Sequence, residues 1–215
     1  MKAVGSILVV CCALGATAGG AAADMTLGFF NITNNVAGNA LIGEQQLFVD
    51  VSDPGGGQVL FTFRNEGPAA SSITDVYFDD GSLLGIAAID NSDPGVEFSQ
   101  WATPPNLPGG NGMVPKFQTT AGFSADSDPP VQPNGVNPGE DLGILFDLKK
   151  HPAATFADVI DELTSGALRI GIHVQGFGGG GSESFVNVPV PVPGALVLGA
   201  MGLGLVACVR RRIGG

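Results

Sequence analysis

Short segments with an apolar residue at every second position, separated by turns rich in glycine and proline, constrain the fold of this chain most strongly. Residues 46–52 have the sequence QLFVDVS and residues 58–64 have the sequence QVLFTFR. Alternation of this kind places the apolar side chains on one face of a β-strand. Between the two segments, residues 53–57 (DPGGG) have the composition of a hairpin loop. The pattern therefore predicts two antiparallel strands that cover a core with one face.

Strand patterns recur along the chain, and one helix interrupts them. Thr155 and Asp158 have the spacing of a capping box, an apolar stripe follows them, and Gly166 ends the periodic segment. The sequence therefore predicts a mainly β fold, an antiparallel β-sandwich of immunoglobulin-like or jelly-roll type with one short helix, and leaves the choice between the two topologies open. The other predicted strands are residues 26–32, 72–78, 83–89, 95–99, 117–124, 141–148, 167–174 and 184–188.

The N-terminal residues 1–23 have the pattern of a secretory signal peptide. A lysine follows the initial methionine, residues 4–14 are apolar, and Ala21 and Ala23 form an A-x-A cleavage site. The apolar run is too short to span a bilayer. We therefore expect export by the secretion machinery and cleavage by signal peptidase.

The C-terminal residues 189–215 have the pattern of a membrane segment. Residues 194–209 contain no charged side chain, and three arginines follow directly. With Pro193 as the first helical residue, the segment reaches roughly 17 residues, the lower limit for crossing a bilayer. The arginines are expected to hold the C-terminus on the cytoplasmic side. The sequence therefore predicts a C-terminal transmembrane helix that anchors the exported protein.

The C-terminal segment contains a proline-valine motif, then a predicted short helix of Gly, Ala and Leu, and then a terminal arginine cluster. This order of features resembles the PEP-CTERM sorting signal of exported bacterial proteins. In that family the position of Val192 is usually Glu. The family's sorting enzyme is an exosortase, a membrane-embedded cysteine transpeptidase that removes the helix and passes the protein to the cell surface or the exopolysaccharide matrix. The resemblance implies an exosortase-like partner and a location at the surface or in the extracellular matrix of a bacterium. Residues 168–177 and 181–187 also resemble the end of an uncharacterised extracellular domain that precedes such tails. The residues that carry the sorting signal are Val190, Pro191, Val192, Pro193, Arg210, Arg211 and Arg212.

The segment between the predicted signal peptide and the predicted sorting signal, residues 24–188, is strongly acidic and free of cysteine. It contains all 20 acidic residues and five of the nine basic residues, which gives a net charge of −15. A charge of this sign argues against a nucleic-acid partner, because binding to phosphates needs a basic surface. The cysteines are Cys11, Cys12 and Cys208. The exported domain is therefore expected to fold without disulfides, zinc thiolates or a cysteine nucleophile.

Acidic side chains in the predicted loops are possible calcium ligands. Carboxylate oxygens are the ligands that Ca²⁺ prefers. No loop has the EF-hand spacing, and Asp or Asn before Pro or Gly also stabilises turns without a metal. The sequence favours turn formation, requires no cofactor, and leaves calcium as an alternative. The weak calcium candidates are Asp79, Asp80, Asp126, Asp128 and Glu140.

Trp101, the single tryptophan of the chain, is the weak candidate for a ligand contact. Exposed aromatic rings act as stacking platforms in carbohydrate-binding modules, but the same residue in this proline-rich stretch also suits a plug in the core. No pair of carboxylates stands out as a glycosidase pair, and neither His151 nor His173 lies in a nucleophile motif, so no catalytic residue is assigned.

These observations together predict a non-enzymatic surface or matrix protein of structural or interaction type, sorted through its C-terminal signal. The first alternative is an adhesion module that binds carbohydrate or calcium, with exopolysaccharide as its partner. The second alternative is a secreted polysaccharide hydrolase.

Overall fold

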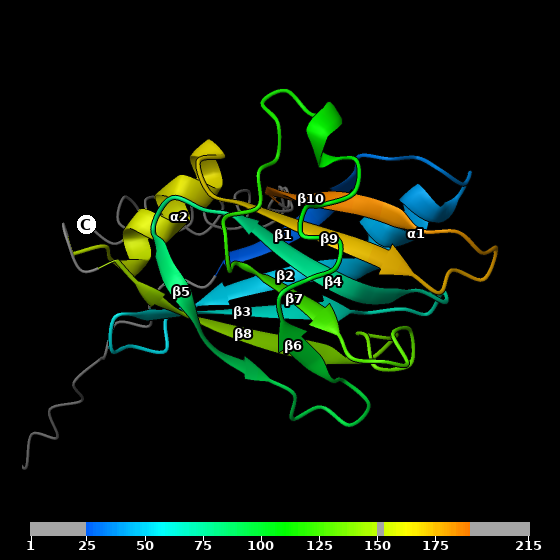
Figure 1. The fold of residues 1–215 in the computed structure, drawn as a ribbon, viewed down its shortest axis with the longest axis horizontal. Coiled ribbons are helices and arrows are strands. Elements are labelled where there is room, and N and C mark those ends of the chain that lie inside the picture. The colour runs from blue at the N-terminus through cyan, green and yellow to red at the C-terminus, as the bar shows by residue number, and fades with distance from the viewer. Residues whose placement is uncertain (1–24, 150–152, 190–215) are drawn as a thin grey trace, which may run out of the picture.

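The computed structural model describes residues 25–149 and 153–189, so the predicted signal peptide and residues 190–215 of the predicted sorting segment lie outside the described residues. The described chain is mainly β, as predicted, with ten antiparallel strands and two α-helices (Figure 1). The strands are β1 (Met25–Asn31), β2 (Leu47–Ser52), β3 (Gln58–Asn65), β4 (Ser72–Asp79), β5 (Leu83–Asp90), β6 (Phe98–Gln100), β7 (Ser124–Ser127), β8 (Asp141–Leu148), β9 (Arg169–Gln175) and β10 (Glu183–Pro189). The helices are α1 (Asn39–Gln46) and α2 (Phe156–Ser165), and a short 3-10 helix covers Gly110–Gly112.

All ten strands belong to one antiparallel sheet, in place of the two separate sheets of the predicted sandwich. The strand order is β5-β8-β3-β2-β1-β10-β9-β4-β7-β6. β1 and β10 lie beside each other near the middle, where Leu27 pairs with Pro189 and Asn31 pairs with Phe185. This pairing joins the half that contains β2, β3 and β8 to the half that contains β9, β4 and β7. The prediction of two sheets was wrong because residue patterns locate strands but do not specify which strands pair.

The sheet curls until its halves face each other, so its shape is close to a barrel (Figure 1). Phe61 on β3, Phe146 on β8 and Phe78 on β4 meet inside it. The ring centroids of Phe61 and Phe78 are 5.1 Å apart and those of Phe78 and Phe146 are 4.6 Å apart, both edge to face. Since β4 is not a neighbour of β3 or β8 in the sheet, these contacts cross the interior. Each such pair contributes about 0.5–1.5 kcal/mol beyond its buried area.

The gap between the two edge strands is bridged by a side chain. The Asn91 amide, which follows β5, donates to the backbone carbonyl of Phe98 on β6 at 3.0 Å and accepts from its N–H at 3.1 Å. An asparagine amide offers both a donor and an acceptor, so it takes the place of one backbone pair of a β-ladder. The barrel is therefore closed at this point by Asn91 and not by paired strands.

The alternating segments supply the interior, as predicted. Their inward residues are fully buried, while the neighbours of these residues along the strands are more exposed. The six inward residues are Leu47, Val49 and Val51 on β2, and Val59, Phe61 and Phe63 on β3.

Loop 101–123, which joins β6 to β7, packs on the outside of the sheet and forms a second, smaller apolar cluster. We call this group the outer cluster; it contains Tyr77, Ala102, Leu107, Phe117 and Val186. The strand predicted at 117–124 was wrong, since β7 begins only at Ser124. Its two aromatic residues point in different directions, because Phe117 belongs to the outer cluster and Phe123 to the interior.

The two helices differ in how well the sequence marks them. Helix α2 was predicted, and the Thr155 and Asp158 capping box is present. Helix α1 was not predicted, because its buried residues, Asn39, Gly43 and Gln46, form no apolar stripe. A Cβ atom at Gly43 would lie 2.2 Å from Cζ of Phe185, so glycine is needed where α1 crosses β10. No helix within residues 25–149 and 153–189 is long and apolar enough to cross a membrane.

A buried carboxylate attaches the segment after β1 to β10. Glu183 is fully buried and accepts hydrogen bonds from Thr33 Oγ1 at 2.6 Å and from Asn31 Nδ2 at 3.2 Å. It also accepts from the backbone N–H groups of Asn35 at 2.9 Å and Val36 at 2.7 Å. Burial raises the pKa of this carboxyl, but these hydrogen bonds outweigh burial, and the pKa lies below its usual value.

We expect Glu183→Gln to lower the free energy of unfolding by about 2–3 kcal/mol at pH 7, since it weakens several hydrogen bonds to a buried charge. Because folding lowers the pKa of Glu183, its contribution is complete above the unfolded pKa, about 4.3, and is lost as the pH falls below that value. Urea unfolding at pH 7 and pH 3.5 measures both effects. The control is Glu97→Gln, an exposed glutamate, for which a change under about 0.5 kcal/mol is expected. Equal losses in the two variants would contradict the assignment.

Candidate functional site

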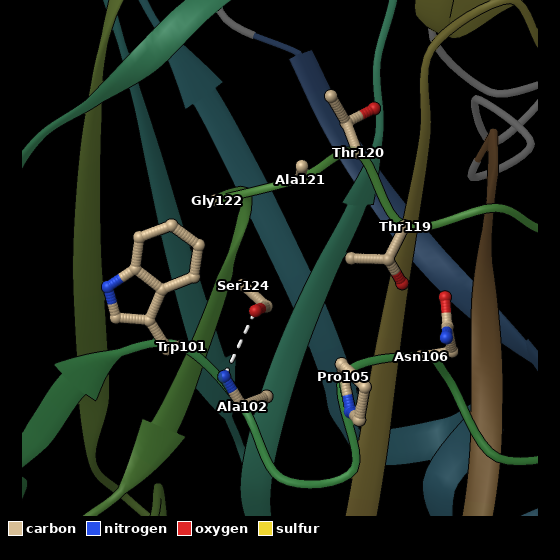
Figure 2. Close-up of a pocket in the computed structure, with 9 residues that line it drawn as sticks. All are labelled: Trp101, Ala102, Pro105, Asn106, Thr119, Thr120, Ala121, Gly122 and Ser124. Carbon is tan, nitrogen blue, oxygen red and sulfur yellow. Dashed lines mark hydrogen bonds between the residues drawn. The ribbon is translucent and has the colours of Figure 1, made fainter.

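Trp101 is the first residue of loop 101–123, and its side chain is 65% exposed. Its backbone φ is 83°, a conformation that residues other than glycine rarely adopt. The Trp101 N–H donates to the carbonyl of Ser124 at 2.8 Å, and the Ala102 N–H donates to Ser124 Oγ at 3.0 Å (Figure 2). Two adjacent hydrogen bonds to the start of β7 therefore hold the strained residue in place. The exposure decides between the two interpretations of Trp101, because a ring this exposed is not a plug in the core.

An open cavity of about 360 Å³ lies beside the Trp101 ring (Figure 2). It lies between the two ends of loop 101–123, which the start of β7 brings together. Gly122 borders the ring so closely that a Cβ atom there would lie 3.1 Å from Trp101 Cη2. The described residues that line the cavity are uncharged: Trp101, Ala102, Pro105, Asn106, Thr119, Thr120, Ala121, Gly122 and Ser124. The walls thus combine an aromatic ring and small apolar groups with hydroxyl and amide groups.

The middle of the loop is fixed to β9. Leu107 and Phe117 cover Gly171, where a Cβ atom would lie 2.6 Å from Leu107 Cδ2. Arg169 lies over the Phe117 ring, 5.3 Å from its centroid, and its Nη1 donates to the Pro115 carbonyl at 2.9 Å. Packing and hydrogen bonds therefore make this loop a defined wall of the cavity.

Asp75 on β4 and Asp126 on β7 lie directly opposite each other, beneath the start of the loop. Asp75 is 3% exposed, accepts from Thr74 Oγ1 at 2.8 Å, and lies 3.3 Å from the Tyr77 hydroxyl. Asp126 accepts from the N–H of Thr103 at 3.3 Å. Burial, reinforced by the charge of Asp126 and opposed by hydrogen bonds from Thr74 and Tyr77, raises the pKa of Asp75 to about 7. Burial also raises the pKa of Asp126. Asp75 therefore keeps its proton over part of the neutral range.

Tyr77 connects this carboxyl pair to the loop. Its hydroxyl oxygen lies 3.0 Å from the Pro104 carbonyl and 3.3 Å from an oxygen of Asp75. A phenol donates one hydrogen, and burial raises the pKa of Tyr77, so that hydrogen is retained. An ionised Asp75 competes strongly for this hydrogen, because charged acceptors form hydrogen bonds about twice as strong as neutral ones. Tyr77 therefore links the loop to Asp75 through its hydroxyl group.

The five predicted calcium candidates do not form one cluster, and each is engaged by a local contact. Asp79 forms an ion pair with Arg169, and Asp126 faces Asp75. Asp80 accepts from the Leu83 N–H at 2.7 Å, Asp128 accepts from Ser99 Oγ at 3.2 Å, and Glu140 accepts from the Asn137 N–H at 2.8 Å. No group of three or more metal-ligating side chains that could hold an ion occurs within the described residues. We assign none of the five as a metal ligand.

Protein families, curated proteins and solved structures provide no match to this chain. The signal-cleavage residues and the whole sorting motif lie outside the described residues, as does His151.

Sequence reasoning singled out Trp101 and Asp126 but missed their surroundings. Thr119 and Gly122 are distant from Trp101 along the chain and meet it only because β6 and β7 pair. Asp75 occurs in a predicted strand, and its partner depends on the β4–β7 register. The one local signal was the acidic residue inside a strand that is otherwise buried along nearly its whole length.

Asp75 should make the domain less stable as the pH rises from 5 to 8. Its folded pKa is raised, so the folded state binds more protons than the unfolded state in this range, and the free energy of unfolding falls. Asp75→Asn removes this term, so its stability relative to the wild type should increase with pH, by at most about 4 kcal/mol. Burial lowers the pKa of His173 and acts in the opposite direction in both proteins, so the difference between them is the quantity to measure.

Urea midpoints of the wild type and Asp75→Asn, taken at intervals from pH 5 to pH 8, provide this difference. Asp161→Asn, which removes an exposed carboxylate from α2, is the matched control. Parallel pH profiles for the wild type and Asp75→Asn would show that Asp75 does not titrate in this range.

Proposed function

We propose that this chain is an exported cell-surface or exopolysaccharide-matrix protein of structural or interaction type. In this proposal signal peptidase removes residues 1–23, the C-terminal helix holds the protein in the membrane, and an exosortase-like enzyme processes residues 189–215. The sequence patterns at both ends support this sequence of events.

The positions of the first and last strands, β1 and β10, carry the structural support. β1 begins and β10 ends at the same end of the barrel, because these strands are antiparallel neighbours with Leu27 opposite Pro189. Helix α2 and the 53–57 hairpin also lie at this end, and α1 lies at the opposite end (Figure 1). A domain tethered through its C-terminus would thus keep the α2 end toward the membrane and direct the α1 end, with its loops, outward.

The polar groups of the site support binding more than catalysis. The described residues around the Trp101 cavity are uncharged, and a glycoside hydrolase needs two accessible carboxyl groups on either side of the scissile bond. The adjacent pair Asp75 and Asp126 does not suit that role, since Asp75 is buried and engaged by Thr74. The proposal is therefore a non-enzymatic protein.

Intact mass of the protein from native membranes and from the surface fraction tests the sorting proposal. We expect an N-terminus at Asp24 and, in the surface fraction, a C-terminus that lacks the arginine cluster. Replacing Arg210, Arg211 and Arg212 by Gln should lower the share of the protein in the surface fraction, because the charges that fix the helix orientation are lost. A mature surface protein that ends at Gly215 would refute processing of the tail.

A further inference from the structure

The Trp101 cavity has the features of a binding site that loop packing alone does not require. The Trp101 ring is exposed, and the backbone of the same residue has an unfavourable conformation. A backbone outlier that the surrounding structure holds in place points to a function. Phe30, the other strongly exposed aromatic residue in the described chain, is 58% exposed, but it lies within strand β1 and does not line the Trp101 cavity. The unusual combination at Trp101 is an exposed ring, a rigid backbone and an adjoining hollow.

The cavity walls suit a ligand that is apolar on its faces and rich in hydroxyl groups at its edges. The indole, Pro105 and Ala121 offer apolar surface, while Asn106 offers an amide. Sugar rings have this distribution, because their C–H groups cover the ring faces and their hydroxyls project from the rim. An aromatic side chain with a fixed orientation binds such a face at low cost in conformational entropy.

Thr119 adds an unused hydrogen-bonding group. Its Oγ1 is buried and has no hydrogen-bond partner among the described residues, although the side chain lines the cavity. Buried hydroxyl groups are normally paired. Rotation about χ1 moves the hydroxyl of a threonine into another staggered position, so Thr119 can turn its hydroxyl to a ligand without breaking an existing bond.

Charge selects among sugars. The domain of residues 24–188 has a net charge of −15, and Asp126 lies on β7, the strand whose first residue, Ser124, lines the cavity. Uronic acids and sulfated sugars would be repelled by this field. The volume of about 360 Å³ is at the lower end of the range for ligand pockets and suits a short stretch of a longer chain.

The geometry points to the Trp101 cavity as a binding site for uncharged sugar rings of a polysaccharide, with one ring stacked on the indole and Thr119 and Asn106 bonded to hydroxyls. This inference rests on the proposed function, because it identifies the matrix component with which the exported domain interacts. It names a ligand class and involves no chemical reaction.

Binding of neutral oligosaccharides by the full-length chain tests this inference. The probes are cellohexaose, laminarihexaose and maltohexaose, with an oligogalacturonate of similar length as the anionic counterpart. The protein is kept in a zwitterionic detergent, since detergents with sugar headgroups would compete. Quenching or shift of the fluorescence of Trp101, the only tryptophan, reports contact at this site, and calorimetry reports affinity. We expect one of the neutral probes to bind with a Kd of about 0.1–1 mM and the anionic probe to bind at least tenfold more weakly.

Three variants make the test specific. Trp101→Ala should weaken binding at least tenfold and Thr119→Val several-fold, while Phe30→Ala, a matched loss of an exposed aromatic ring, should leave the affinity unchanged within twofold. Because Trp101 is exposed, we expect its variant to keep the melting temperature of the wild type. Sugar binding that survives Trp101→Ala would overturn the inference, as would preference for the anionic probe. Binding of proline-rich peptides with no sugar binding would overturn it as well. The mass and fractionation of the native protein test export separately, so failure of one proposal is distinguishable from failure of the other.

Discussion

The pairing of β1 with β10 is the contact on which the rest of this structure depends. These are the first and last strands of the described domain. On its other side, β1 pairs with β2 and β10 pairs with β9. Without this pairing the molecule would consist of two separate half-sheets with unprotected edges. Once joined, the halves curl around one interior, and Phe61 and Phe78 meet across it. Glu183, at the first residue of β10, adds polar contacts that hold the connection after β1 against the same joint.

The candidate site depends on the position of β4, which the pairing of β1 with β10 brings next to the interior. The strand lies beyond β9, and its inward residues Val76 and Phe78 pack in the interior. Its outward residues Asp75 and Tyr77 are also buried, because loop 101–123 covers that face. β4 is thus the strand where the core and the loop meet. A buried carboxyl group, that of Asp75, lies there under the proline-rich segment that carries Trp101, and Tyr77 connects the two.

The sequence predicted the strands with a clear apolar pattern and the capped helix, and it missed the features that only tertiary contacts stabilise. β2, β3 and β8 alternate because one face lies in the interior and the other is more exposed, and their predicted bounds agree with the structure within one residue. Helix α2 has its own cap and stop. By contrast, α1 is held by the contact of Gly43 with Phe185, and Phe117 is buried by a loop, so neither leaves a periodic signal.

The candidate site shows the same division. The single tryptophan and the acidic residues were visible in the sequence, and so was turn formation as the simpler role of Asp80 and Glu140. Whether Trp101 is covered or exposed depends on where β6 and β7 place the two ends of a long loop. The Asp75–Asp126 pair likewise depends on register between strands far apart in the chain. These features are tertiary, and local propensity carries no information about them.

The site lies outside the barrel, so the residues that form it are not the residues that form the interior core. The interior cluster is built of apolar side chains from both half-sheets, whereas the cavity residues come from loop 101–123 and the first residue of β7. A residue with the backbone conformation of Trp101 costs on the order of 1–3 kcal/mol, and such strain persists only where the surroundings over-determine it. Here the two hydrogen bonds to Ser124 and the close approach of Gly122 provide that constraint locally. The loop therefore holds an exposed ring rigidly on its own small cluster, and side chains around the cavity are free to change without opening the interior.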